Sequence, residues 1–155
     1  MLKPLSFTPL NLPELLTQAA NLPTSGRLAN SRDNLCYLDL SDDYIHQLFP
    51  FLQETEAQKP DYFGENLVGA HISVIYPEEK RLVGGSDLGQ IHHFSIKGAF
   101  SADLGAKRYY VLLVNAPSLL LLRKKQGLPD RLAFKDHWID FHITLGVCSI
   151  PNPAL

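Results

Sequence analysis

A four-residue pattern that occurs twice is the feature that most constrains this chain. His71-Ile72-Ser73-Val74 and His142-Ile143-Thr144-Leu145 share the order histidine, apolar, hydroxyl, apolar, at a separation of 71 residues. Each copy lies in an apolar run that predicts a β-strand. Because successive side chains of a strand point to opposite faces, each copy places its histidine and its hydroxyl on one face, with apolar side chains behind them.

The same alternation predicts which side chains face the core. In the strand expected over residues 68–76, the core candidates are Val68, Ala70, Ile72, Val74 and Tyr76. In the strand expected over residues 139–147, they are Ile139, Phe141, Ile143, Leu145 and Val147. Each pair of histidine and hydroxyl is therefore expected to be backed by a hydrophobic wall.

Length and composition narrow the class of protein. The 155 residues, 45% hydrophobic and 19% charged, predict one soluble domain with a substantial core. The formal charge of −2 argues against binding duplex DNA, whereas a small nucleotide or a short RNA end needs only local positive charge. Pro4, Pro9 and Pro13 interrupt the first residues, so neither a secretion signal nor a membrane span is expected. A cytoplasmic monomer without a membrane partner is the expectation.

The remaining residues predict a series of strands and helices. We expect an extended arm over 1–12, a short helix from Pro13 to Ala20 and a loop over 21–34. Strands are expected over 35–40, 91–100 and 107–115, and helices from Ser41 and over 117–126. In the last helix, Arg123, Lys124 and Lys125 are expected to be mostly exposed. Residues 77–90 and 128–138 predict irregular connections.

These elements indicate an internal repeat. Residues 35–76 read as strand, helix and motif strand, and residues 107–148 repeat that order. Two such half-repeats can pack about a pseudo-two-fold axis, which would bring the two motifs face to face across a cleft. Strand histidines placed by chance are not expected at corresponding points of both units.

Two facing histidines suit a reaction that needs one proton removed and another supplied. Histidine titrates near neutrality, so one imidazole can start neutral and the other protonated. In-line displacement at phosphorus has this requirement. The hydroxyls of Ser73 and Thr144 can donate hydrogen bonds to the non-bridging phosphoryl oxygens, where negative charge must be stabilised. This scheme needs no metal ion.

The paired motifs are similar to the His-x-Thr/Ser-hydrophobic motifs of the two-histidine (2H) phosphoesterase superfamily, which includes bacterial RNA 2′,5′-ligase-like proteins and cyclic phosphodiesterases. The segments HFSIKGAF, RYYVLLVNAPSLLLLRKKQGL and FHITLGV follow the family's order of strand, strand, helix and motif strand. The resemblance covers residues 35–148 and leaves 1–34 as an N-terminal extension without an assigned role. Ser73 stands where Thr is commoner, which keeps the hydroxyl.

The resemblance implies a single α+β domain over residues 1–155. Its fold would be bilobal, with two pseudo-symmetric antiparallel-sheet lobes, helices outside and a central cleft. The implied activity is a phosphodiesterase without cofactor or metal, acting on a cyclic nucleotide phosphate or a 2′,5′-type linkage. Carried over residue by residue, His71 and His142 are the catalytic pair, and Ser73 and Thr144 contact the phosphate. Which histidine is the base is not determined by the sequence.

Aromatic residues that precede the motifs are candidates for stacking on a nucleobase: Tyr62, Phe63, Phe134 and Trp138. Burial in the core is favoured over stacking for each of them, because aromatic side chains are most often buried. Lys97, Arg131 and Lys135 are candidates for additional phosphate-binding charge.

Two other classes of function compete with the enzyme. One is a nucleotide-binding or RNA-end-binding module that uses the same cleft without turnover, although such a module needs no acid–base pair. The other makes the histidines metal ligands. Asp140 shares a face with His142, but no further carboxylate or cysteine stands at ligand spacing. The metal site ranks last.

Overall fold

The computed structural model describes residues 2–53, 55–60 and 67–151. It has a mixed α+β fold, as expected. The helices are α1 (Pro13–Ala19), α2 (Asp43–His46) and α3 (Pro117–Lys125), with 3₁₀ turns η1 (Phe49–Leu52) and η2 (Pro77–Glu79). The strands are β1 (Lys3–Pro4), β2 (Thr8–Pro9), β3 (Ser25–Asn30), β4 (Cys36–Asp39), β5 (His71–Ile75), β6 (Ile91–His93), β7 (Ser95–Leu104), β8 (Lys107–Asn115), β9 (Leu132–Phe134), β10 (His137–Ile139) and β11 (His142–Ser149).

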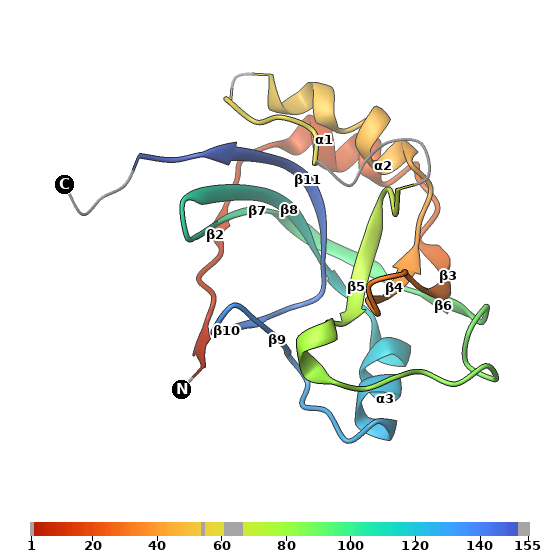
Figure 1. The fold of residues 1–155 in the computed structure, drawn as a ribbon. Helices are drawn as coiled ribbons and strands as arrows, with labels where there is room; N and C mark the ends of the chain where they lie inside the picture. The colour runs from red at the N-terminus through yellow and green to blue at the C-terminus, as the bar shows by residue number, and fades with distance from the viewer. Residues whose placement is uncertain (1, 54, 61–66, 152–155) are drawn as a thin grey trace.

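One curved sheet joins the two expected half-repeats (Figure 1). Its eight strands lie in the order β2-β7-β8-β11-β5-β4-β3-β6, and a smaller sheet has the order β1-β10-β9. The two motif strands, β5 and β11, are antiparallel neighbours near the centre of the large sheet, where Ile143 lies opposite Ile72. The topology therefore brings the two motifs together directly, although they are 71 residues apart in the sequence.

The hydrophobic core forms on the side of the motif strands that carries their apolar residues. Ile72 and Val74 of β5 and Ile143 and Leu145 of β11 are at most 1% exposed. They belong to one cluster that includes buried side chains of all three helices, among them Leu15, Ile45 and Leu119. The alternation thus correctly predicted the core-facing side of these four residues, whereas Val68 and Ile139, also expected in the core, line the cavity described below.

Two expected irregular segments contain strands instead. Residues 21–34 include β3, which pairs with β4 on one side and β6 on the other. Residues 128–138 include the β9–β10 hairpin, whose two turn residues, Lys135 and Asp136, both have positive φ. These residue types are not the Asn-Gly or Asp-Gly pairs that usually indicate such a turn, so no strong hairpin signal is present in this segment. The strand expected over 91–100 is divided at Phe94 between β6 and β7.

Arg123 is buried, contrary to the expectation that it is mostly exposed. Its side chain is 0% accessible and its guanidinium donates five hydrogen bonds. Two go to the carboxylate of Glu79, at 2.8 and 2.6 Å, and the others to the carbonyls of Val74, Pro129 and Arg131. Helix α3 is therefore tied to the end of β5 and to the segment that leads into β9.

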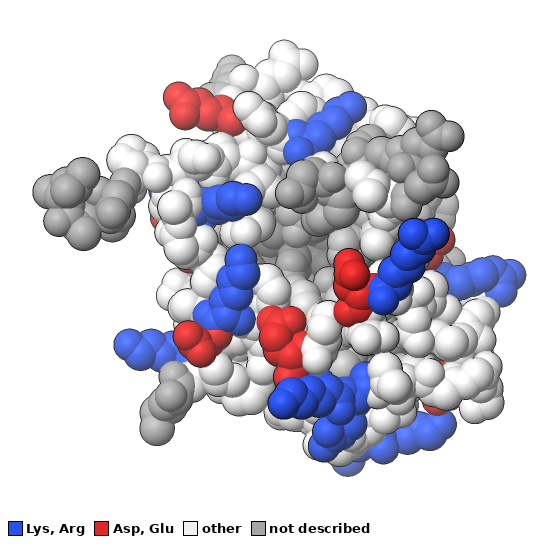
Figure 2. All heavy atoms as spheres, viewed as in Figure 1, with Lys and Arg blue, Asp and Glu red and all other residues white. Residues whose placement is uncertain are grey.

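The surface carries charges of both signs. In the face shown in Figure 2, Lys and Arg side chains lie among Asp and Glu side chains over most of the view, and several Lys and Arg side chains adjoin one another at its lower edge. Among the described residues, no helix is long and apolar enough to cross a membrane.

Substituting Glu79→Gln should destabilise the fold strongly, because it leaves the buried guanidinium of Arg123 without its counter-charge. We expect the free energy of unfolding to fall by about 3–5 kcal/mol, the usual cost of breaking a buried ion pair from one side. Urea unfolding followed by circular dichroism measures this.

The matched control is Asp103→Asn, which breaks the ion pair between Asp103 and Arg108, whose side chains are 47% and 42% exposed. This change should cost less than about 1 kcal/mol. Equal effects of the two substitutions would contradict a special role for the buried pair.

Candidate active site

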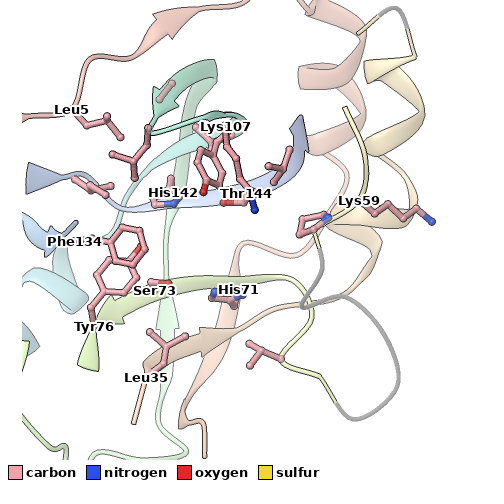
Figure 3. A pocket seen from close by; sticks show the side chains of 18 of the residues that line it. Leu5, Leu35, Lys59, His71, Ser73, Tyr76, Lys107, Phe134, His142 and Thr144 are labelled. Atoms are coloured by element: carbon pink, nitrogen blue, oxygen red, sulfur yellow. The ribbon is translucent and has the colours of Figure 1, made fainter. Parts of the chain in front are cut away.

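All four motif side chains line one cavity of about 940 Å³. His71, Ser73 and Thr144 are 7–9% exposed, and His142 is half-buried. Because Ile143 lies opposite Ile72 in an antiparallel pair, His142 lies across from Ser73, and Thr144 lies across from His71. Figure 3 shows this crossed arrangement. Each imidazole therefore faces the hydroxyl of the other motif.

The two imidazoles are held in the same way. Nδ1 of His71 lies 2.8 Å from the carbonyl oxygen of Gly69, and Nδ1 of His142 lies 2.9 Å from that of Asp140. A carbonyl oxygen only accepts, so Nδ1 donates in both cases. In a neutral imidazole this leaves the lone pair on Nε2, which is then the nitrogen able to take a proton.

The local environment lowers the pKa of both histidines. Burial lowers the pKa of His71 to about 4, partly opposed by the hydrogen bond to Gly69, and the nearby His142 lowers it further. Burial also lowers the pKa of His142, opposed by the hydrogen bond to Asp140 and by its charge. Both shifts favour the neutral form of the imidazole over the charged form. An anionic group bound between them raises the pKa of each, because it favours the charged form.

The backbone that holds His71 requires a glycine. Gly69 has φ of +73°, and a Cβ there would lie 2.5 Å from Oδ1 of Asp42. The same Oδ1 accepts a hydrogen bond of 3.0 Å from the backbone N–H of Ala70. Asp42 thus fixes the chain beside the carbonyl that orients His71.

Asp140, whose carbonyl orients His142, also forms an ion pair through its side chain. The carboxylate of Asp140 pairs with Arg131 at 3.2 Å. The carbonyl of Arg131 accepts a hydrogen bond of 2.7 Å from buried Arg123. The segment that precedes the second motif is therefore linked to the ion pair between Arg123 and Glu79.

Irregularities at the ends of the motif strands add side chains to the cavity. A β-bulge between Thr144 and Gly146 reverses the alternation of β11, so Val147, expected in the core, lines the cavity. Tyr76, also expected in the core, lines it as well, because β5 ends at Ile75 before the 3₁₀ turn. Burial raises the pKa of the Tyr76 phenol to about 12, and a hydrogen bond with Ser73 opposes this shift.

The predicted stacking residues have different positions. Phe134 lines the cavity, and its ring stacks on Tyr76 with centroids 4.5 Å apart. Trp138 is not among the lining residues. It precedes Ile139, which does line the cavity, and neighbouring strand residues point to opposite faces. Tyr62 and Phe63 lie outside the described residues.

Charged lining residues were missed in the sequence reasoning. Lys107 lines the cavity, and Figure 3 shows its side chain extending from β8 toward Thr144, whereas Lys59 extends away. Lys107, Tyr109 and Val111 alternate on β8 beside the second motif strand, and all three line the cavity. Period-two reading of the strand expected over 107–115 could have identified them. Of the earlier candidates, Arg131 pairs with Asp140, and Nζ of Lys135 lies 5.2 Å from the centre of the Phe134 ring.

In the described part of the chain, no three His, Cys, Asp or Glu side chains form a group that could hold a metal ion. The metal-ligand interpretation of the motifs therefore has no third ligand among these residues.

Comparisons with known proteins agree with the paired motifs. A family model described as "Swiss Army Knife, 2H phosphoesterase domain" matches residues 36–150. The match includes both motifs and excludes the N-terminal segment with α1 and β3. The searches of curated proteins and of solved structures returned no match.

The low pKa of His71 is directly measurable. Its imidazole should stay neutral from pH 8 down to about pH 5 and gain its proton near pH 4, because the buried neutral form is favoured over the charged one. Two-dimensional ¹H–¹³C NMR of the ring Cε1–H group measures this, with His71→Gln assigning the signal. Titration between pH 6 and 7, as for a solvated histidine, would contradict the described environment.

Proposed function

This chain belongs to the 2H phosphoesterase family, and we propose that it hydrolyses a phosphodiester with His71 and His142 as the acid–base pair. The family is generally hydrolytic and acts on phosphoesters. The observation that carries the proposal is the crossed arrangement, in which each imidazole lies across from the hydroxyl of the other motif in one cavity.

The geometry supports a concerted use of both motifs. Nε2 of one neutral imidazole takes a proton from the attacking water, whose oxygen forms the new bond to phosphorus. The other imidazole, protonated when the anionic substrate binds, gives its proton to the departing oxygen as its bond to phosphorus breaks. Ser73 and Thr144 donate hydrogen bonds to the non-bridging oxygens. Lys107 adds positive charge near Thr144.

The two histidines have nearly equivalent hydrogen bonds, so the orientation of the substrate decides which of them acts as the base and which as the acid. Each histidine has the same hydrogen bond to the carbonyl two residues before it. This likeness also supports the predicted pseudo-two-fold relation between the half-repeats and the bilobal cleft.

We propose a cyclic nucleotide phosphate or a 2′,5′-type phosphodiester as the substrate, bound without metal or other cofactor. The cavity of about 940 Å³ has the size of a small-molecule site. Aromatic lining residues, Tyr76, Tyr109 and Phe134, can contact a base. The mixed charges seen in Figure 2 favour a small nucleotide or an RNA end over duplex nucleic acid.

A binding module that uses the same cavity without turnover is the alternative. A protein that only binds a nucleotide would use the aromatic lining residues and Lys107 equally well. The two oriented imidazoles favour the enzyme, because a pure binder has no use for an acid–base pair.

Turnover in EDTA tests the proposal. The substrates are 2′,3′-cyclic nucleotides, ADP-ribose cyclic phosphate and 2′,5′-linked oligonucleotides. We expect product from one of these classes, and a decrease in kcat of about 10²–10⁴-fold in His71→Ala and in His142→Ala, because each removes one proton-transfer group. Chromatography of the products measures both.

The matched control is His93→Ala, which removes an exposed strand histidine outside the cavity and should keep full activity. Full turnover in either motif variant would contradict the proposal. Tight binding without product from any substrate would favour the binding module.

A further inference from the structure

The N-terminal arm, defined here as residues 2–10, lies outside the family match over 36–150, yet it is fixed against the domain at two points. Strand β1 pairs with β10 of the small sheet, and the N–H of Leu5 donates to the carbonyl of Trp138 at 2.9 Å. Strand β2 pairs with β7, and the N–H of Leu10 donates to the carbonyl of Ala99 at 2.9 Å. Figure 1 shows the arm running from the small sheet to the large one.

Between these two points the arm presents apolar side chains to the cavity. Leu5 and Phe7 line the cavity and are half-buried, whereas Ser6 and Thr8 are exposed, as expected for extended backbone. Leu10, further along the arm, packs against the hydrophobic core. The arm therefore directs Leu5 and Phe7 to the space that holds the motif residues.

Leu5 shares one end of the cavity with the aromatic pair, Tyr76 and Phe134, and Phe7 lines the same cavity two residues further along the arm. In Figure 3, Leu5, Phe134 and Tyr76 lie on one side of the two histidines and Lys59 lies on the other. The pair is held in place by Glu79, whose carboxylate accepts hydrogen bonds from the N–H groups of Tyr76 and Ala133. This end of the cavity thus has an apolar and aromatic wall fixed by backbone contacts, and Glu78, two residues after Tyr76, also lines the cavity.

We propose that the arm and the β9–β10 hairpin form a binding subsite for the aromatic base of the substrate, with Phe7 as a specificity-determining residue. The proposal rests on the proposed phosphodiesterase function. A nucleobase has flat, weakly polar faces that gain from stacking and from burial against apolar side chains. The phosphate group occupies the space between the histidines, and the base extends toward Leu5, Phe7 and the Tyr76–Phe134 pair.

The test compares two cyclic diesters that differ only in the base: adenosine 2′,3′-cyclic phosphate and the 2,3-cyclic phosphate of 1-O-methylribose. The measured quantity is the ratio of kcat/KM for the first substrate to that for the second. Phe7→Ala should lower this ratio by about tenfold, within the range of stacking on one aromatic side chain. Phe7→Leu, which keeps an apolar side chain but removes the ring, should also lower it. Thermal unfolding of each variant verifies that the domain is folded.

Ser6→Ala is the matched control, because it changes an exposed side chain of the same arm and should keep the ratio of the unaltered protein. Equal losses on both substrates in Phe7→Ala and Phe7→Leu would overturn the subsite. If the unaltered protein cleaves neither substrate, the turnover panel with 2′,5′-linked oligonucleotides decides about the proposed function, and calorimetric binding of the same two diesters decides about the arm. Tighter binding of the adenosine compound, lost in Phe7→Leu, would support the subsite, and equal binding of both compounds would overturn it.

Discussion

The buried guanidinium of Arg123 is the constraint on which much of this structure depends. A buried charge is tolerated only when a counter-charge and hydrogen-bond acceptors surround it. Arg123 finds them on the carboxylate of Glu79 and on the carbonyls of Val74, Pro129 and Arg131, so helix α3, the end of β5 and the approach to β9 must meet at one place. The first motif strand and the hairpin beside the second are therefore assembled around the same ion pair.

This packing explains how the two short motifs, which are distant in the sequence, form one site. The antiparallel register with Ile143 opposite Ile72 crosses the two pairs of histidine and hydroxyl. Backbone carbonyls, themselves held in place through Asp42 and through Arg131, orient the imidazoles. Burial then lowers the pKa of both rings, which favours the neutral form of each imidazole. In the proposed mechanism, the negative charge of the bound substrate raises the pKa of one imidazole, and this imidazole then becomes protonated.

The sequence alone predicted the local features of this arrangement, and few of the features that depend on contacts between distant residues. The period of two placed the motif histidines and hydroxyls, and the apolar residues between them, on the correct faces, because each strand alternates regardless of its partners. The bulge that turns Val147 into the cavity depends on pairing with β8, which a single strand does not encode. Arg123 stands among basic residues of α3, so only its tertiary partners reveal that it is buried. The role of the arm follows from its contacts with β7 and β10, both distant in sequence.

Proton uptake on binding of a phosphodiester shows whether one of the two histidines becomes charged beside the bound anion. The ligand is a slowly cleaved 2′,3′-cyclic phosphorothioate, whose diester group does not titrate near neutrality. Calorimetry at pH 7 in buffers of different ionisation enthalpy gives the number of protons bound with the ligand. The account predicts uptake of close to one proton, because a neutral imidazole becomes charged beside the anion, and loss of this uptake when both His71 and His142 are replaced by Gln. Binding without proton uptake in the unaltered protein would contradict it.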